Sequence, residues 1–469
     1  MRISEILKCT KGLLISGDPN AEIDIGKLST DSRSTREGGL FIAIKGKIFD
    51  GNNFIGDAFK KGAAGAVVSS WHPGHTRTRH PALCRVPGCQ GVPIIKVKNT
   101  TKAYGEIAGC HRARFNIPVV AVTGSNGKTT TKDMIAHILS GRLNVLKTEG
   151  TRNNHIGVPE TLIRLKKGVD AAVIEMGMNH AGEIRYLCGI ARPSAGVVTN
   201  IGESHLKFLG RVENIYKAKM ELLDSLPDGA AAILNGDDRF LSGFRTKRLK
   251  IITFGLDGHN VFRASSVKCK NGLCSFSLNG KRRFELRLLG RHNIYNALAA
   301  AAVSSYLGIG LGHAARRLAE FKGSSGQRLG TKKISGIEFI NDSYNSNPLS
   351  MRCAIDSLSG YATGGKKFLI SGDMLELGRL ARSFHAEAGE FAAKAGIDFI
   401  FTIGALSRHT LRAALSSGMN RTSAFVCKNH ADAALALRRL AKRGDVVLVK
   451  GSRAMRMEKV IETFKAMAD

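Results

Sequence analysis

The sequence lacks any long apolar run, and this excludes the simplest membrane-spanning architecture. In 469 residues, no stretch approaches the ~20 consecutive apolar residues that cross a bilayer as a helix. The N-terminal segment MRISEILKCTKG contains an acidic residue and no apolar h-region, so it does not have the pattern of a secretory signal. We therefore expect a cytoplasmic protein that is not inserted in a membrane.

Aromatic residues are scarce, at 6%, although the net charge is +32. A chain this basic raises the question of a nucleic-acid partner. Proteins that bind single strands stack bases on aromatic side chains among the basic ones. Here Lys and Arg are spread along the whole chain, and no such platform is visible. We expect no nucleic-acid partner, and a polyanionic substrate would equally be attracted by this charge.

Paired cysteines are absent as well, because none of the nine cysteines forms a CxxC motif. An odd number of scattered cysteines predicts free thiols in a reducing compartment. The Pro-, Gly- and Arg-rich stretch 71–91 does combine His72, His75, His80, Cys84 and Cys89. Their spacings match no established zinc pattern, so an exposed loop is favoured over a zinc site.

The chain is too long for one core, since domains typically contain about 100–200 residues. From Ile117 onward, short apolar runs alternate with helical patterns, which is typical of α/β domains with mainly parallel sheets. Strands are predicted at 119–123, 171–176, 196–201, 230–234, 251–254, 337–340, 367–370, 399–403 and 446–449, and helices include 212–226 and 455–468. We predict three domains, at residues 1–113, 114–323 and 324–469, the last after the linker GSSG at 323–326.

The motif TGSNGKTT follows the apolar run 119–123 and opens a helical pattern, as a phosphate-binding loop does. Gly124 and Gly127 would let backbone amides approach phosphate oxygens, and the helix N-terminus would add its dipole. Lys128 would reach the β- and γ-phosphates, and the Thr129 hydroxyl would bind Mg²⁺. Val122 replaces the first glycine of the usual pattern. The predicted nucleotide-binding residues of this variant loop are Gly124, Ser125, Asn126, Gly127, Lys128, Thr129 and Thr130.

Two further side chains follow predicted strands, at the edge where open α/β sheets bind ligands. Glu175 ends the run AAVIEM, and its carboxylate suits Mg²⁺. His205 comes shortly after GVVTNIG and would be an ordinary loop histidine by itself. Beside Thr129 and Glu175, it becomes a candidate for a second metal ion. Lys219, in YKAKMEL, would by position alone be a solvated lysine.

Together these motifs resemble the Mur ligases, ATP-dependent amino-acid and peptide ligases of peptidoglycan synthesis. The matching segments are TGSNGKTT, EMGMNHAGEI, TNIGESHL, YKAKMEL, LNGDD and GRHNIYNALAA. Others are similar to the family member that joins D-alanyl-D-alanine to a UDP-linked tripeptide, namely STDSR with FIAIKGKIFDGNNFI, TRNNHIGVPETL, NDSYNSNP, SGDMLELG and VLVKGSRAMRMEKVI. The long basic stretch 71–91 and the strong positive charge depart from the family pattern.

The resemblance implies a UDP-binding first domain, a central domain with a parallel sheet that carries ATP and Mg²⁺, and a C-terminal Rossmann-like domain. It implies that Lys219 is carbamylated and helps to hold a second Mg²⁺, and that Arg328 contacts the transferring phosphate. The predicted catalytic residues are Lys128, His205, Lys219 and Arg328. The predicted metal ligands are Thr129, Glu175, His205 and Lys219. It also places Asn293 against the adenine, Asp342 against the ribose, Ser32 and Arg33 at the UDP end, and Asn153 and Asn154 at the peptide.

Other functions remain open at this point. Within the same superfamily, the ligase that adds the third stem residue and a folylpolyglutamate synthase are alternatives, although NDSYNSNP and VLVKGSRAMRMEKVI favour the dipeptide-adding member. A nucleic-acid-stimulated NTPase and a relative without activity are the others. We expect a monomer whose substrates are UDP-N-acetylmuramoyl-tripeptide and D-alanyl-D-alanine.

Overall fold

Strands in the described part of the chain form three sheets, of four, nine and six strands. The computed structural model describes residues 1–46, 48–70, 91–323 and 327–467. It divides into two compact units, one made of Met1–Val120, Asn144–Met176 and Glu183–Pro193, and the other of Ala121–Leu143, Gly177–Gly182 and Ser194–Asp469. Within the described ranges, no helix is long and apolar enough to cross a membrane.

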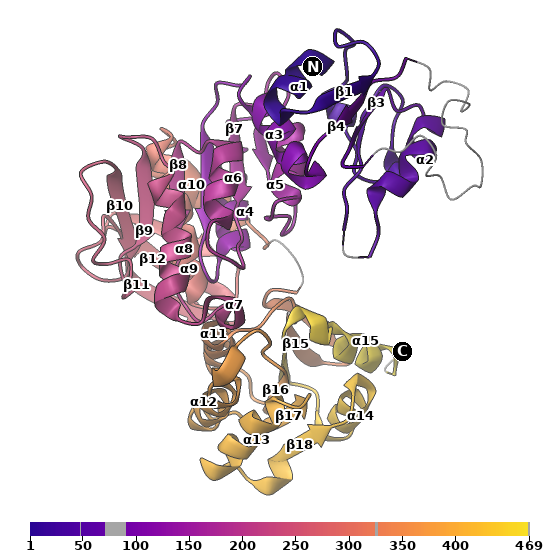
Figure 1. The fold of residues 1–469 in the computed structure, drawn as a ribbon. Helices are drawn as coiled ribbons and strands as arrows, with labels where there is room; N and C mark the ends of the chain where they lie inside the picture. Colours follow the sequence, from indigo (N-terminus) through magenta and orange to yellow (C-terminus); the bar gives the residue numbers. More distant parts are fainter. Residues whose placement is uncertain (47, 71–90, 324–326, 468–469) are drawn as a thin grey trace. The chain divides into compact units, whose positions relative to one another are not determined.

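The first unit begins with the four-stranded sheet, in the order β1-β4-β3-β2. Strands β2 and β3 and strands β3 and β4 pair in parallel, and β1 pairs antiparallel with β4. Figure 1 shows these elements in indigo and violet. The elements of this unit are α1 (Ile3–Thr10), β1 (Leu13–Ser16), β2 (Leu40–Ile42), α2 (Ile55–Lys60), β3 (Gly65–Val68), β4 (Ile94–Lys96), α3 (Thr100–Arg112), β6 (Val145–Lys147), α5 (Gly157–Ile163), β7 (Ala171–Glu175) and α6 (Glu183–Ala191).

The nine-stranded sheet has the order β13-β12-β11-β10-β9-β8-β5-β7-β6, and the two units share its strand β5 (Val119–Thr123). Strands β8 to β11 pair in parallel, whereas β11, β12 and β13 form an antiparallel meander. The further elements are α4 (Lys128–Leu139), β8 (Ala195–Val198), α7 (Leu206–Leu209), α8 (Val212–Asp224), β9 (Ala231–Asn235), β10 (Lys250–Gly255), β11 (Phe262–Lys270), β12 (Leu273–Leu278), β13 (Arg282–Leu286), α9 (His292–Tyr306) and α10 (Leu311–Glu320).

The six-stranded sheet has the order β14-β15-β19-β16-β17-β18, parallel except for β14. Alternate strand residues face opposite sides, as a strand's period of two requires. Leu369 packs against α11 and α12, whereas Phe368 and Ile370 pack on the side of α14 and α15. The elements, in orange and yellow in Figure 1, are β14 (Gly330–Ile334), β15 (Ile337–Asp342), α11 (Pro348–Ser359), β16 (Lys367–Gly372), α12 (Ala381–Lys394), β17 (Phe399–Ile403), α13 (Ser407–Ser416), β18 (Ala424–Cys427), α14 (His430–Leu440), β19 (Val446–Lys450) and α15 (Glu458–Ala466).

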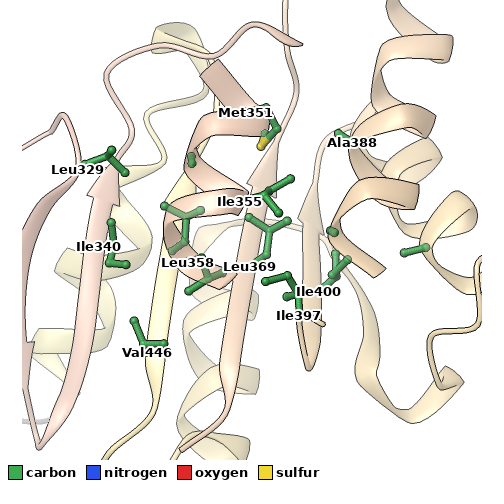
Figure 2. Close-up of a cluster of buried hydrophobic side chains, with 14 of the residues drawn as sticks. Leu329, Ile340, Met351, Ile355, Leu358, Leu369, Ala388, Ile397, Ile400 and Val446 are labelled. Carbon is green, nitrogen blue, oxygen red and sulfur yellow. The ribbon is translucent and has the colours of Figure 1, made fainter. Parts of the chain in front are cut away.

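The core on the α11 side is shown in Figure 2, where Ile355 of α11 points at Leu369 of β16. Ile355 is fully buried. We expect Ile355→Ala to lower the free energy of unfolding of this region by about 2–5 kcal/mol, because the cavity it leaves collapses only in part. Urea denaturation would measure the change. Ile355→Val is the matched control and should cost about 0.5–1.5 kcal/mol. Equal costs for the two variants would contradict this account of the packing.

Three local predictions are wrong. The strand expected at 196–201 ends at Val198, because the next residues turn aside to bind the loop at 124–127. The last helix begins at Glu458 rather than at 455, since Arg456 adopts a left-handed conformation with φ 48°. Free thiols were expected throughout, yet Cys269 and Cys274 form a disulfide, because they are directly opposite each other on β11 and β12.

Two predictions lie outside the described residues. The zinc or loop interpretation of 71–91 concerns residues 71–90, and most of the predicted linker falls on residues 324–326.

Candidate active site

The loop between β5 and α4 needs glycine at two positions. Gly124 has φ 146°, and a Cβ there would lie 1.9 Å from Oγ1 of Thr199. Gly127 has φ 80°, and a Cβ there would lie 2.4 Å from Oδ1 of Asn296. Both conformations are ones that L side chains rarely adopt. The glycines therefore bring the loop against neighbouring segments, with its amides at the N-terminus of α4.

The segment after β8 holds this loop in place. The amide of Ser125 donates to the carbonyl of Asn200 at 2.9 Å, and the Ser125 hydroxyl donates to the carbonyl of Gly202 at 2.9 Å. The amide of Asn126 donates to the Asn200 side chain at 2.9 Å, and the Thr199 hydroxyl donates to the Asn126 carbonyl at 2.5 Å. The motif TNIGES thus fixes the backbone of the loop at 124–127 through these hydrogen bonds.

Lys128 begins helix α4 and folds back over the loop. Its Nζ donates to the carbonyl of Gly124 at 2.8 Å and to that of Ser125 at 3.3 Å. Thr129 is 4% exposed, and Thr130 is half-buried. An ammonium beside the N-terminus of a helix is an arrangement that binds phosphate. The loop 124–127 therefore lies between a buried strand and a helix that begins at Lys128, and its role in nucleotide binding stays a prediction.

Lys219 and His205 lie within electrostatic reach of Lys128. Lys219, on α8, is 2% exposed, and its pKa lies well below the usual 10.5 because burial and then the charge of Lys128 disfavour its protonated form. Burial, Lys128 and Lys219 likewise lower the pKa of His205. The structure thus brings together three of the four predicted catalytic residues.

The side chain of His205 is oriented by a residue far along the chain. Its Nδ1 lies 3.0 Å from Oε2 of Glu376, in the loop that follows β16. The amide of Lys207 donates to the Glu376 carbonyl at 2.9 Å. His205 and Glu376 both have positive φ, at 57° and 64°. Sequence reasoning missed Glu376, although it lies in the motif SGDMLELG that carries part of the family resemblance.

In the first unit, Glu175 ends β7 and is 1% exposed. Its Oε1 accepts a hydrogen bond from the Asn153 side chain at 2.7 Å, and its buried Oε2 has no hydrogen-bond partner in the described structure. A buried carboxylate oxygen without a partner is costly unless a ligand satisfies it. Asn153 therefore orients a candidate metal ligand. Asn154 instead accepts from the amides of Ile156 and Gly157 at 3.0 Å, where α5 begins.

Asn293 lies on α9 and is 6% exposed. Its side chain donates to the carbonyl of Leu289 at 2.8 Å and accepts from Asn296 at 2.9 Å. Asn296 in turn accepts from the hydroxyl of Thr131 on α4 at 3.1 Å. This chain of amides joins the motif GRHN to the helix of the phosphate loop. Asn296 was missed, although its position three residues after Asn293 places both on one helix face.

Asp342 ends β15 and forms an ion pair with Lys450, which ends β19, at 2.5 Å. The Lys450 side chain is 1% exposed and also donates to the carbonyl of Asn345 at 2.9 Å. Arg328 lies with its guanidinium 4.0 Å from the ring centroid of Tyr344. Lys450 was missed, because only the sheet brings it beside Asp342.

Asn347 connects the phosphate loop to helix α11. Its side chain accepts from the amide of Ser350 at 2.8 Å, which caps the helix, and donates to the Asn126 side chain at 2.9 Å. Asn126 returns a hydrogen bond at 3.2 Å. The motif NDSYNSNP therefore has a direct contact with the nucleotide loop.

The predicted UDP-binding residues lie in the first unit. Ser32 is buried, whereas Arg33 is exposed and pairs with Asp31 at 2.8 Å. The Arg33 guanidinium and amide lower the pKa of Asp31 to about 2. Arg33 thus has the exposure that binding an external anion requires.

Comparison with known proteins gives these features a family. Models of the Mur ligase family match residues 24–112 (catalytic domain), 122–304 (middle domain) and 327–453 (glutamate ligase domain). A UDP-N-acetylmuramoyl-tripeptide–D-alanyl-D-alanine ligase of Bacillus subtilis is 36% identical, over 98% of this chain and 97% of that protein. The chain belongs to the Mur ligase family.

Solved structures of Mur ligases agree with this assignment. A structure of MurF from Acinetobacter baumannii has a TM-score of 0.87 and 30% identity, over 99% of this chain and 98% of the other. MurF from Thermotoga maritima in complex with ADP has a TM-score of 0.83 and 27% identity, over 95% and 99%. The predicted three-domain α/β fold class is confirmed.

The predicted metal ligands of this Mur ligase include just two residues of the types that usually cluster around metals. Among the described residues, no group of three or more His, Cys, Asp and Glu side chains is placed to hold a metal ion. The other two members of the predicted set are Thr129 and Lys219, whose side chains carry a hydroxyl and an amine.

Proposed function

We propose that this chain is an ATP-dependent ligase that joins D-alanyl-D-alanine to UDP-N-acetylmuramoyl-tripeptide in peptidoglycan synthesis. The observation that carries the proposal is the loop 124–130 with Lys128, His205 and the buried Lys219 around it, in a chain that matches ligases of this name along nearly its whole length. The domain limits 1–113, 114–323 and 324–469 are part of the proposal.

The reaction is an activation followed by an aminolysis. A carboxylate does not react with an amine in water, because oxide is too poor a leaving group. The γ-phosphoryl group of ATP passes to the terminal carboxylate of the tripeptide, which gives an acyl phosphate and releases ADP. The neutral amine of D-alanyl-D-alanine attacks the acyl carbon, its nitrogen loses one proton, and the tetrahedral intermediate collapses to an amide and phosphate. Each step gathers negative charge that the protein must stabilise.

Separate groups of residues serve these steps. Gly124, Ser125, Asn126, Gly127 and Thr130 bind the phosphates through the loop, and Lys128 stabilises the transferring charge. Arg328 contacts the same phosphate. Asn293 and Asp342 position the nucleoside, Ser32 and Arg33 bind the UDP end, and Asn153 and Asn154 face the peptide. The ion pair of Asp342 with Lys450 supports this, because it leaves one carboxylate oxygen for a hydroxyl group.

The donor residues also fit Mg²⁺. Glu175 has a buried, unpartnered oxygen, Thr129 has a buried hydroxyl, and His205 has one ring nitrogen that is not bonded to Glu376. A carbamate on Lys219 would supply the further carboxylate of the set. When bound, Mg²⁺ would offset phosphate charge and act as a Lewis acid. Thr129, Glu175 and Lys219 are buried, so their donor atoms are largely shielded from water.

We also propose that the protein acts as a cytoplasmic monomer. The proposed co-substrate ATP is supplied in the cytoplasm, and one chain carries every residue of the proposed site. Size-exclusion chromatography with light scattering would test the monomer.

The direct test is phosphate release with D-alanyl-D-alanine and UDP-N-acetylmuramoyl-tripeptide, with meso-diaminopimelate and with lysine as the third residue in separate assays. Release is expected only when ATP, a tripeptide and the dipeptide are all present, with a product whose mass is that of the pentapeptide. A panel of other amines with the UDP-dipeptide is the control. Ligation of a free amino acid there, without activity toward D-alanyl-D-alanine, would assign the chain to another step.

A further inference from the structure

The motif SGDMLELG has no role in the proposed function so far, and its Glu376 contacts a proposed metal ligand. Glu376 lies in the segment that matches the C-terminal family model, whereas His205 lies in the segment that matches the middle domain. Oε2 of Glu376 and Nδ1 of His205 are 3.0 Å apart. We propose that Glu376 is a positioning residue that orients His205 for Mg²⁺, so that the C-terminal domain completes the metal site of the middle domain.

The chemistry of imidazole supports this role. A carboxylate accepts hydrogen bonds and does not donate them, so Nδ1 of His205 carries the proton that points at Glu376. In the neutral ring, Nε2 then keeps its lone pair for a metal ion. Histidines that bind metals usually donate their other N–H to a carboxylate or carbonyl, which fixes the tautomer and the orientation of the ring. The contact of His205 with Glu376 has this form.

The backbone around Glu376 is held firmly enough to position a partner. On its N-terminal side, the amide of Met374 donates to Nε2 of His385 at 2.9 Å, and the amide of Leu375 donates to Oγ of Ser452 at 2.8 Å. Met374 and Leu377, on either side of the motif's tip, are buried. Glu376 itself has a left-handed φ of 64°, a conformation that costs energy in a non-glycine residue and persists where surrounding contacts impose it.

The contact has two independent links between the same segments. Besides the side-chain pair, the amide of Lys207 donates to the carbonyl of Glu376 at 2.9 Å. His205 also has a left-handed φ, of 57°. Both residues of the pair therefore have a backbone conformation that surrounding contacts must impose. Glu376 is also 48% exposed at its side chain, so burial alone does not account for its position.

This inference rests on the proposed function, and metal binding without turnover tests it. We would titrate Mn²⁺, a paramagnetic stand-in for Mg²⁺, into the full-length protein with a non-hydrolysable ATP analogue and follow free Mn²⁺ by electron paramagnetic resonance. Glu376→Ala is expected to weaken Mn²⁺ binding about 10–100-fold. Glu376→Gln keeps an acceptor oxygen, so its affinity for Mn²⁺ should lie between those of the wild type and Glu376→Ala. Glu390→Ala removes an exposed carboxylate on the nearby helix α12 and should bind like the wild type.

The variant His205→Ala distinguishes a failure of the positioning role of Glu376 from a failure of the proposed function. If His205→Ala weakens binding and both Glu376 variants do not, the positioning role is wrong and the proposed function stands. If neither His205→Ala nor Glu376→Ala changes binding, His205 is not a ligand, and that part of the proposed function fails too. A rise in KM for D-alanyl-D-alanine in Glu376→Ala, with unchanged Mn²⁺ affinity, would instead make Glu376 a substrate contact and overturn the inference. A thermal melt of each variant shows whether it is folded. If Glu376→Ala does not fold, the Mn²⁺ affinity of Glu376→Gln provides the test.

Discussion

Replacing Lys128 with alanine is expected to reduce ligation by about 10²–10³-fold or more, while the fold survives. Lys128 lies at the N-terminus of α4, and its Nζ contacts the carbonyls of Gly124 and Ser125 in the loop that we propose binds the phosphates. The ammonium stabilises charge that grows as the phosphoryl group moves, so its loss should affect kcat more than the binding of UDP-tripeptide. Phosphate release in the presence of both substrates measures the effect.

The structure also supplies the controls for this variant. Lys247 is an exposed lysine of the same unit, and Lys247→Ala should leave activity unchanged. Circular dichroism and a thermal melt should show that Lys128→Ala is folded, because the loop keeps its contacts with Thr199 and Asn200. Phosphate release near the wild-type rate in Lys128→Ala would refute the role given to this lysine.

The parts of the site that could be predicted are those encoded within short segments. Strand β5 and the start of α4 fall where the apolar run and the glycines placed them, because a buried parallel strand followed by a glycine turn has a local signature. The same holds for β7 and its terminal Glu175. The position of the loop between β5 and α4 was therefore predictable from the amino-acid sequence alone.

The parts that could not be predicted depend on contacts between distant segments. Glu376 and His205 are separated by 171 positions, and Lys450 and Asp342 by 108. No periodicity links such pairs. The pairing of β15 with β19 brings Asp342 beside Lys450, and a contact between segments that follow strands of two different sheets brings Glu376 to His205. The shortened strand β8 has the same origin, because Thr199 bonds to the phosphate loop instead of continuing the strand.

The cysteine prediction failed for a related reason. Cys269 and Cys274 are five residues apart and match no paired motif. They become neighbours because β11 and β12 form a tight antiparallel hairpin, which the mainly parallel α/β pattern did not indicate. Gly272 lies in the turn of this hairpin with φ 81°. A glycine in such a turn is a sequence signal for a hairpin.

Lys219→Ala is expected to lose activity more severely than the roughly 10²-fold that removing an outer-shell partner of a metal costs, and short carboxylic acids should restore part of it. The reason is the environment of Lys219. It is 2% exposed, and burial and Lys128 hold its pKa well below 10.5, so a larger fraction of the amine is neutral near neutral pH than for an exposed lysine. A neutral amine can attack CO₂; a nitrogen–carbon bond forms, one proton leaves, and a carbamate replaces the ammonium.

The matched control lies two residues away on the same helix. Lys217 is exposed on α8, and Lys217→Ala should retain wild-type activity and show no response to acetate or formate. Removing dissolved CO₂ and bicarbonate should lower wild-type activity reversibly and leave Lys219→Ala unaffected, because the variant has no amine to modify. Because neutralisation of Lys219 is favoured by its surroundings, raising the pH should increase CO₂ loading only modestly. Full activity of Lys219→Ala without added acid would show that no carbamate is needed, and the ammonium would then be a buried cation that the active site merely tolerates.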